Sequence, residues 1–169
     1  AKDLSIDQSI DFGSTAAAFS GGAGDFTVEF EPGATSLEKE GKGYVVASLG
    51  VESGYIPYTA YCARESYLKE QEETVQHFVN ALKKGMVYVN THTPEEIAKT
   101  IQPQFQETEL EVITRIVRRY AEQDTWKSDL NFEKESFELL QELLLDAGEL
   151  KEKVPYEKLV TTKYTEKQK

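Results

Sequence analysis

The stretch DFTVEFEP, residues 25–32, decides the predicted fold, because the side-chain pattern changes there from a strand pattern to a helix start. Phe26, Val28 and Phe30 alternate with polar residues, which predicts a β-strand with one apolar face. Pro32 then suits the first turn of a helix, which we expect to run to about Glu40. A strand that leads directly into a helix is the repeating unit of α/β proteins.

The same alternation continues on both sides of this stretch. Residues 4–8 alternate apolar and polar, and residues 12–20 predict a short helix that stops at two glycines. Residues 44–49 form an almost continuous apolar run, which is typical of a strand covered on both faces, and residues 58–63 predict one further strand. The sequence therefore predicts an α/β fold with right-handed crossovers.

The rest of the chain has the periodicity of helices. Apolar residues recur at intervals of three and four over 75–89 and over 137–147. Two capping boxes, at 93–96 and 108–111, predict two further helix starts. We therefore expect the C-terminal half to be rich in helices.

Composition excludes several classes of protein. The 169 residues contain 19 Lys and Arg against 30 Asp and Glu, a net charge of -11 that phosphate backbones repel, so no nucleic-acid partner is expected. No apolar run approaches the roughly 20 residues that span a bilayer. Cys62, which we expect to be a buried thiol, is the single cysteine, and His77 and His92 are the only histidines. The sequence therefore predicts no metal site.

Sequence signatures of catalysis are missing as well. The chain has no nucleophile elbow, zinc-protease motif or phosphate-binding Walker loop. The run at 21–24, Gly-Gly-Ala-Gly, follows a predicted helix rather than opening one, which favours a turn over a dinucleotide site. We expect neither an enzyme activity nor a cofactor.

A first candidate binding segment lies between the strand at 4–8 and the helix that follows it. There Gly13, Ser14 and Thr15 would present backbone N–H groups and hydroxyls at a helix start, which suits a polar ligand. An ordinary helix cap by Ser14 or Thr15 is an equally good interpretation.

A second candidate segment ends the strand at 25–30. Glu29 and Glu31 place two carboxylates beside Phe30, where open α/β sheets bind ligands. Two acids this close favour a neutral or cationic ligand, such as an amine or a ring nitrogen that takes a proton. The alternative is a solvated pair on an acidic protein.

In order and spacing, several short motifs resemble the SsuA-like family of substrate-binding proteins of ABC importers, which bind sulfonates, nitrate, taurine and thiamine-pyrimidine precursors. The motifs are Phe12-Gly13-Ser14-Thr15, Gly24-Asp25-Phe26 followed by Phe30-Glu31-Pro32, the run at 45–49, the helix start at 93–96, and the close from 147 to 160. Family members have alanine where this chain has Phe26.

The resemblance covers only the C-terminal part of these longer proteins. It implies an incomplete, periplasmic-binding-protein-like (type II) fold of two lobes, with residues 1–52 ending the second lobe and 53–169 returning to the first. It also implies that two lobes close around a small solute. From their positions at strand ends, we expect Gly13, Ser14, Thr15, Glu29 and Glu31 to face that solute. Tyr58 and Tyr55 are secondary candidates, because crossover segments in this family border the cleft. Packing at the lobe junction is the favoured interpretation for both tyrosines.

The resemblance further implies partners and a location. ABC permease subunits would recognise the loaded protein, which would be extracytoplasmic, either periplasmic or a membrane-associated lipoprotein, with its signal upstream of this sequence. Because three predicted helices carry full apolar stripes, we also expect other polypeptide to cover them, either a missing N-terminal segment or a second copy of the chain.

Two rival functions follow from related proteins. Fungal thiamine-pyrimidine synthases resemble these binders in fold but use a cysteine-rich motif and a lysine that holds a pyridoxal cofactor, and Cys62 is alone here. A ligand-sensing regulatory domain is the other alternative, which an attached DNA-binding helical domain would support.

Overall fold

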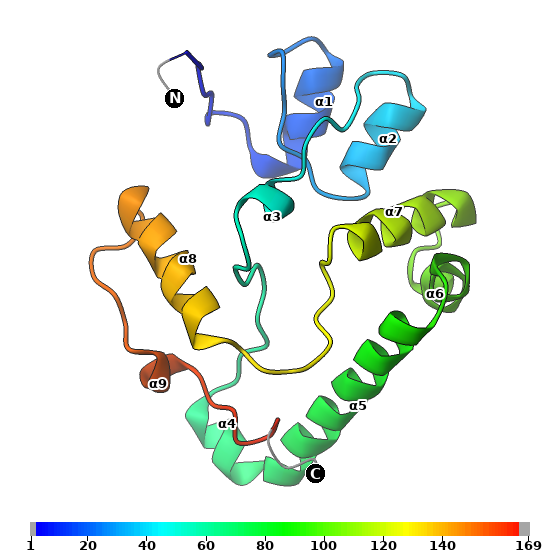
Figure 1. The fold of residues 1–169 in the computed structure, drawn as a ribbon. Coiled ribbons are helices and arrows are strands. Elements are labelled where there is room, and N and C mark those ends of the chain that lie inside the picture. Colours follow the sequence, from blue (N-terminus) through cyan, green and yellow to red (C-terminus); the bar gives the residue numbers. More distant parts are fainter. Residues whose placement is uncertain (1–2, 166–169) are drawn as a thin grey trace. The chain divides into compact units, whose positions relative to one another are not determined.

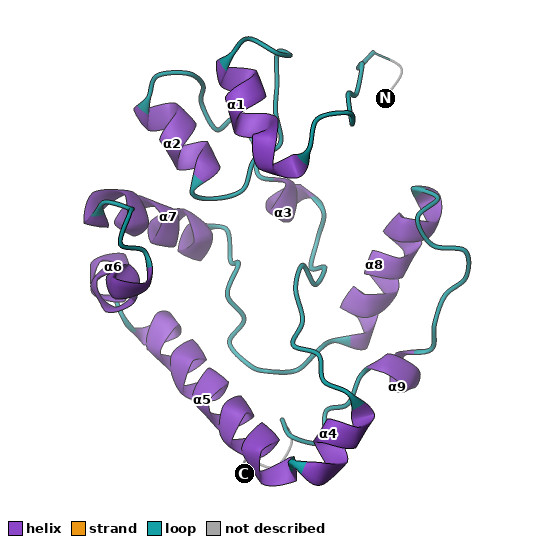
Figure 2. Cartoon of the chain, turned by 180° about the vertical axis from the view of Figure 1, so that it is seen from behind, coloured by secondary structure: helices purple, strands orange, loops and turns teal. Residues whose placement is uncertain are grey.

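Helices are the only regular elements in residues 3–165, which the computed structural model describes. Figure 1 shows their order along the chain, and Figure 2 shows helices joined by loops, with no strand drawn. The predicted α/β fold class, with its periplasmic-binding-protein-like sheets, is therefore wrong.

The four predicted strands are loops for a physical reason. Residues 4–8, 25–30, 44–49 and 58–63 have no strand assignment, and Leu49, the last residue of the third predicted strand, begins a short helix. A strand is stable only beside other strands, and alternation in a sequence shows its faces but not its neighbours. The backbone N–H of Val45 instead donates to a carboxylate oxygen of Glu38, 3.0 Å away, where a sheet would supply a carbonyl.

Two compact units divide the chain. The first contains residues up to 48 together with 94–122, and the second contains 49–93 together with the residues from 123 onward. The predicted lobes, 1–52 and 53–169, are not tested by this division and stay a prediction.

Six helical elements lie among the described residues of the first unit. They are η1 (Phe12–Ser14), α1 (Thr15–Ser20), α2 (Gly33–Lys39), α6 (Pro94–Ile101), η2 (Gln102–Gln104) and α7 (Leu110–Glu122). The most extensive packing is between α6 and α7, and α2 contacts both α1 and α7. Ile97, Ala98, Ile113 and Val117 are buried and form the apolar core of the α6–α7 pair. The helix starts predicted at 93–96 and 108–111 are confirmed.

The second unit holds the remaining helices. They are α3 (Leu49–Glu52), α4 (Glu65–Glu70), α5 (Glu72–Thr91), α8 (Lys134–Asp146) and α9 (Tyr156–Leu159). The sequence predicts α5 and α8 but not the short α3, α4 and α9. Gly148, at φ +77°, follows α8 in the left-handed conformation that glycine adopts freely, and the N–H of Glu149 bonds back to Leu144.

The aromatic residue Phe137 anchors the core around α8. Its ring lies 5.8 Å from that of Tyr156 on α9 and 6.1 Å from that of Phe132, measured between centroids. Tyr164 is also buried and donates its hydroxyl to the carbonyl of Leu68, 3.0 Å away. The segment after α8 is therefore fixed to α8 and to the end of α4.

Gln141, buried on α8, holds the segment before α9 by two hydrogen bonds. Its Nε2 donates to the carbonyl of Val154 at 3.2 Å, and its Oε1 accepts from the N–H of Val154 at 2.7 Å. Replacing Gln141 with leucine would leave both backbone groups of Val154 without these partners. We expect the free energy of unfolding to fall by about 2 kcal/mol in a urea titration.

Glu142→Gln is the matched control for this prediction. It removes an exposed ion pair with Lys153 from the neighbouring position, which should cost less than about 1 kcal/mol. Equal losses of stability in the two variants would contradict the inference that the two hydrogen bonds of Gln141 hold the segment before α9.

No helix in the described part of the chain combines the length and the apolar character that a membrane crossing needs.

Candidate functional site

The two predicted binding segments meet through a pair of aromatic rings. Phe12, next to Gly13, and Phe30, next to Glu29, contact edge to face with their centroids 5.0 Å apart. Phe12 is 66% exposed and Phe30 is 39% exposed, so both rings remain accessible from solvent. The structure therefore places Phe12 of the first predicted segment against Phe30 of the second, within the first unit.

The polar groups of the first segment are partly engaged. The backbone N–H of Ser14, which we expected to be free, donates to the carbonyl of Asp11 at 2.8 Å. The hydroxyl of Thr15 donates to the carbonyl of Phe12 at 3.0 Å. Gly13 has open space where a side chain would begin. The segment is thus a tight turn with an open face at Gly13.

Glu29 is half-buried and lies close to the start of α2. Its Oε1 accepts a hydrogen bond from the hydroxyl of Thr27 at 3.0 Å. Its Oε2 lies 3.2 Å from the point where a Cβ at Gly33 would stand, so a side chain there would press on the carboxylate. Glycine at position 33 therefore leaves the room that this carboxylate occupies.

Glu31 has a different environment from Glu29. Its side chain is 6% exposed, and its carboxylate accepts from Nη1 of Arg119 on α7 at 2.5 Å and from the N–H of Thr35 at 3.0 Å. Arg119 also donates to Glu38 at 2.6 Å and to the hydroxyl of the buried Thr35 at 3.3 Å. Glu31 therefore ties the start of α2 to α7.

The charges in this cluster stabilise one another. Burial alone would raise the pKa of Glu38, but hydrogen bonds from the N–H of Val45 and from Arg119 outweigh it, and the pKa lies below its ordinary value. Burial alone would lower the pKa of Arg119, but the hydrogen bonds that Arg119 donates to Glu38 and Glu31 outweigh it and raise this pKa. These hydrogen bonds therefore favour the charged forms of Glu38 and Arg119.

Tyr58 and Tyr55 belong to the second unit. Tyr58 is 75% exposed. The hydroxyl of Tyr55 donates to Asp124 at 2.6 Å, and this hydrogen bond raises the pKa of Tyr55. The structure does not place either tyrosine relative to Gly13 and Glu29.

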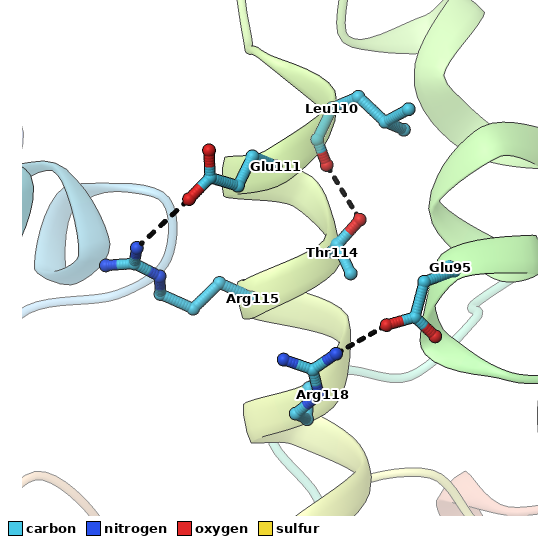
Figure 3. Close-up of a pocket in the computed structure, with 6 residues that line it drawn as sticks. All are labelled: Glu95, Leu110, Glu111, Thr114, Arg115 and Arg118. Atoms are coloured by element: carbon cyan, nitrogen blue, oxygen red, sulfur yellow. Dashed lines mark hydrogen bonds and ion pairs between the residues drawn. The ribbon is translucent and has the colours of Figure 1, made fainter.

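An open pocket of about 460 Å³ lies along α6 and α7 (Figure 3). Its lining residues are Glu95, Leu110, Glu111, Thr114, Arg115 and Arg118. Arg118 pairs with Glu95 at 2.5 Å, and Arg115 pairs with Glu111 at 3.6 Å. Figure 3 shows both pairs, together with the hydrogen bond that the hydroxyl of Thr114 donates to the carbonyl of Leu110. Because these polar groups already bind one another, the pocket is a weaker candidate for a solute site than the segments around Phe12 and Phe30.

Other residues that the sequence singled out lie at the surface. Cys62 is exposed rather than buried, since the predicted strand that contains it, residues 58–63, is a loop. His77 and His92 are exposed, and the ring of His92 stacks on that of Tyr88. Within the described residues, no three His, Cys, Asp or Glu side chains are placed to hold a metal ion.

The sequence interpretation missed Arg119. It pairs with a residue 88 positions earlier in the chain, a separation at which no local pattern applies. The available signal was a cluster of three arginines, at 115, 118 and 119, in an otherwise acidic chain.

Comparison with known proteins gives the class of this protein. The model of the family described as "NMT1/THI5 like" matches residues 5–97, which is more than half of the chain and includes both predicted binding segments. The chain therefore belongs to the NMT1/THI5-like family, and the resemblance seen in the sequence is confirmed at this level.

One relative extends the match to almost the whole chain. The protein named "Putative binding protein YtlA", from Bacillus subtilis strain 168, is 39% identical over 166 residues. The match covers 98% of this chain and 50% of the relative, so the chain spans about half the length of that protein. No solved structure gives a significant match.

Proposed function

We propose that this chain is part of an extracytoplasmic solute-binding protein that delivers a small polar solute to an ABC permease, and that it is not an enzyme. The observation that carries the proposal is the 39% identity to a protein named as a binding protein, sustained over nearly every residue of the chain. The paired segments around Phe12 and Phe30, inside the region that the family model matches, are the proposed solute site.

The charge of this site favours a neutral or cationic solute, for example an aminopyrimidine-like ring. Arg119 compensates Glu31, whereas the contact described for Glu29 is with the uncharged hydroxyl of Thr27. Glu29 is thus the carboxylate available to a ligand. The rings of Phe12 and Phe30, which are partly accessible to solvent, also suit a cation or a flat ring. An anion would have to be desolvated beside a carboxylate, at a cost of several kcal/mol.

Calorimetry with the 169-residue chain tests the solute class. The probes are an aminopyrimidine, an aliphatic amine, taurine and nitrate, and native mass spectrometry of the freshly purified chain looks for a solute carried through purification. We expect binding of the neutral or cationic probes only. Tight binding of taurine or nitrate would contradict the proposed role of Glu29.

The substitution Glu29→Gln tests the residue itself. It keeps the shape of the side chain and removes its charge, so the affinity for a cationic probe should fall about tenfold or more, the worth of one charged hydrogen bond. Glu40→Gln is the control, because it makes the same charge change at an exposed carboxylate, at the end of α2. If both variants lose affinity equally, a general charge effect is responsible and Glu29 is not at the site.

A further inference from the structure

The segment that carries Glu29 alternates covered and exposed side chains. Thr27 and Glu29 are half-buried and the side chain of Glu31 is 6% exposed, whereas Val28 is 61% exposed and Phe30 is 39% exposed. The better covered side chains are therefore the three polar ones at alternate positions. On that side of the segment, the hydroxyl of Thr27 reaches the carboxylate of Glu29.

Thr27 and Gly33 define where the carboxylate of Glu29 lies. Its Oε1 accepts the hydrogen bond from the hydroxyl of Thr27 at 3.0 Å. Its Oε2 lies beside Gly33, 3.2 Å from the position that a Cβ would take there. Because the bond from Thr27 engages Oε1, Oε2 is the oxygen that can accept from an N–H group outside the chain without breaking that bond.

The residues that follow Glu29 are already fixed. Glu31 accepts a hydrogen bond from Nη1 of Arg119 at 2.5 Å and another from the backbone N–H of Thr35 at 3.0 Å. Because these bonds anchor the chain two residues after Glu29, the conformational freedom that matters at Glu29 is that of its long side chain. A side chain that is ordered before the solute arrives loses less conformational entropy on binding.

We propose that Thr27 is a positioning residue of the solute site: its hydroxyl holds Oε1 of Glu29 so that Oε2 accepts a hydrogen bond from an N–H group of the solute. Thr27 acts through Glu29 and does not need to touch the solute itself. The inference rests on the proposed function for the class of solute. The hold of Thr27 on Glu29 exists in the chain without solute, so it is tested there as well.

The substitution Thr27→Val keeps the shape of the side chain and replaces the hydroxyl with a methyl group. Three-bond NMR couplings of the 169-residue chain without solute measure the χ1 and χ2 angles of Glu29. We expect one set of angles in the unchanged chain and averaging over several rotamers in the variant. Calorimetry with butylamine and 4-aminopyrimidine should show an affinity that is lower by about fivefold, the worth of one ordinary hydrogen bond.

Thr27→Ser separates positioning from packing, because serine keeps the hydroxyl and loses a methyl group. It should preserve both the single set of Glu29 angles and the affinity of the unchanged chain. Thr100→Val is the matched control, since it makes the same change on α6, where the hydroxyl of Thr100 donates to the carbonyl of Glu96 at 3.0 Å. This control should also leave the Glu29 angles and the affinity unchanged.

Three results would overturn the inference. They are Glu29 angles that do not respond to Thr27→Val, an affinity that does not respond to it, and equal losses in Thr27→Val and Thr27→Ser. If neither probe binds the unchanged chain, the proposed function fails instead, and the angles of Glu29 then decide alone whether Thr27 holds the carboxylate.

Discussion

Replacing Arg119 with methionine is expected to lower the free energy of unfolding by about 3 kcal/mol. Methionine preserves much of the length of the side chain but leaves the carboxylate of Glu31, which is 6% exposed, without its cation. Breaking a buried ion pair from one side costs about 3–5 kcal/mol, and the 24% exposure of Arg119 places this pair at the lower end. The measurement is a urea titration with amide exchange of α2 and α7.

Arg118→Met is the control for this prediction, since it removes the same charge from the next position of the same helix. The ion pair of Arg118 with Glu95 is half-exposed on both sides, so its loss should cost less than about 1 kcal/mol. If the two variants are equally stable, the cluster around Arg119 does not tie α2 to α7.

The pH dependence of stability gives a second readout of Arg119→Met. The pKa of Glu38 lies below its ordinary value of 4.5 in the folded chain, so the unfolded chain takes up this proton first as the pH falls. The contribution of Glu38 to stability is therefore complete above about pH 4.5 and is lost as the pH falls through the folded pKa. Without Arg119 the pKa of Glu38 should rise, and this part of the acid destabilisation should become smaller.

The helices could be predicted because their causes are local. The stripes of α5, α7 and α8 lie within single stretches of sequence, and Pro94 marks the start of α6 from its own backbone geometry. The strands could not be predicted in the same way. Alternation over 25–30 describes the side chains of one segment, whereas a sheet depends on neighbours that lie elsewhere in the chain.

Only part of the candidate site could be inferred from the sequence. Phe12 and Phe30 flank two segments whose polar residues indicated binding, and the structure brings these segments together. Glu29 and Glu31 looked equivalent in the sequence, because they are two positions apart beside the same aromatic residue. In the structure, Arg119 pairs with Glu31. Because Arg119 lies 88 positions further along the chain, the sequence did not reveal this pairing, and we predicted both glutamates as ligand contacts.

Ile113→Ala is expected to cost about 3 kcal/mol, within the range for large-to-small changes in a core. Ile113 is 4% exposed on α7 and belongs to the core of the α6–α7 pair with Ile97 and Val117. The loss combines the transfer of the removed carbon atoms to water with the cavity that remains. Because the same helix carries Arg119, loosening it should also weaken the contact with α2.

Ile116→Ala separates packing from helix propensity, since it makes the same chemical change on α7 at a half-buried position. Alanine is a better helix former than isoleucine, which favours both variants by less than about 1 kcal/mol, so propensity cannot explain a difference between them. The expected cost at 116 is smaller than that at 113, because part of the Ile116 side chain already contacts water in the folded chain. Urea titrations of both variants measure the difference, and equal costs would mean that α6 and α7 do not form the core of the first unit. Slow amide exchange in α6 that survives Ile113→Ala would lead to the same conclusion, because α6 is stable only while α7 covers its apolar face.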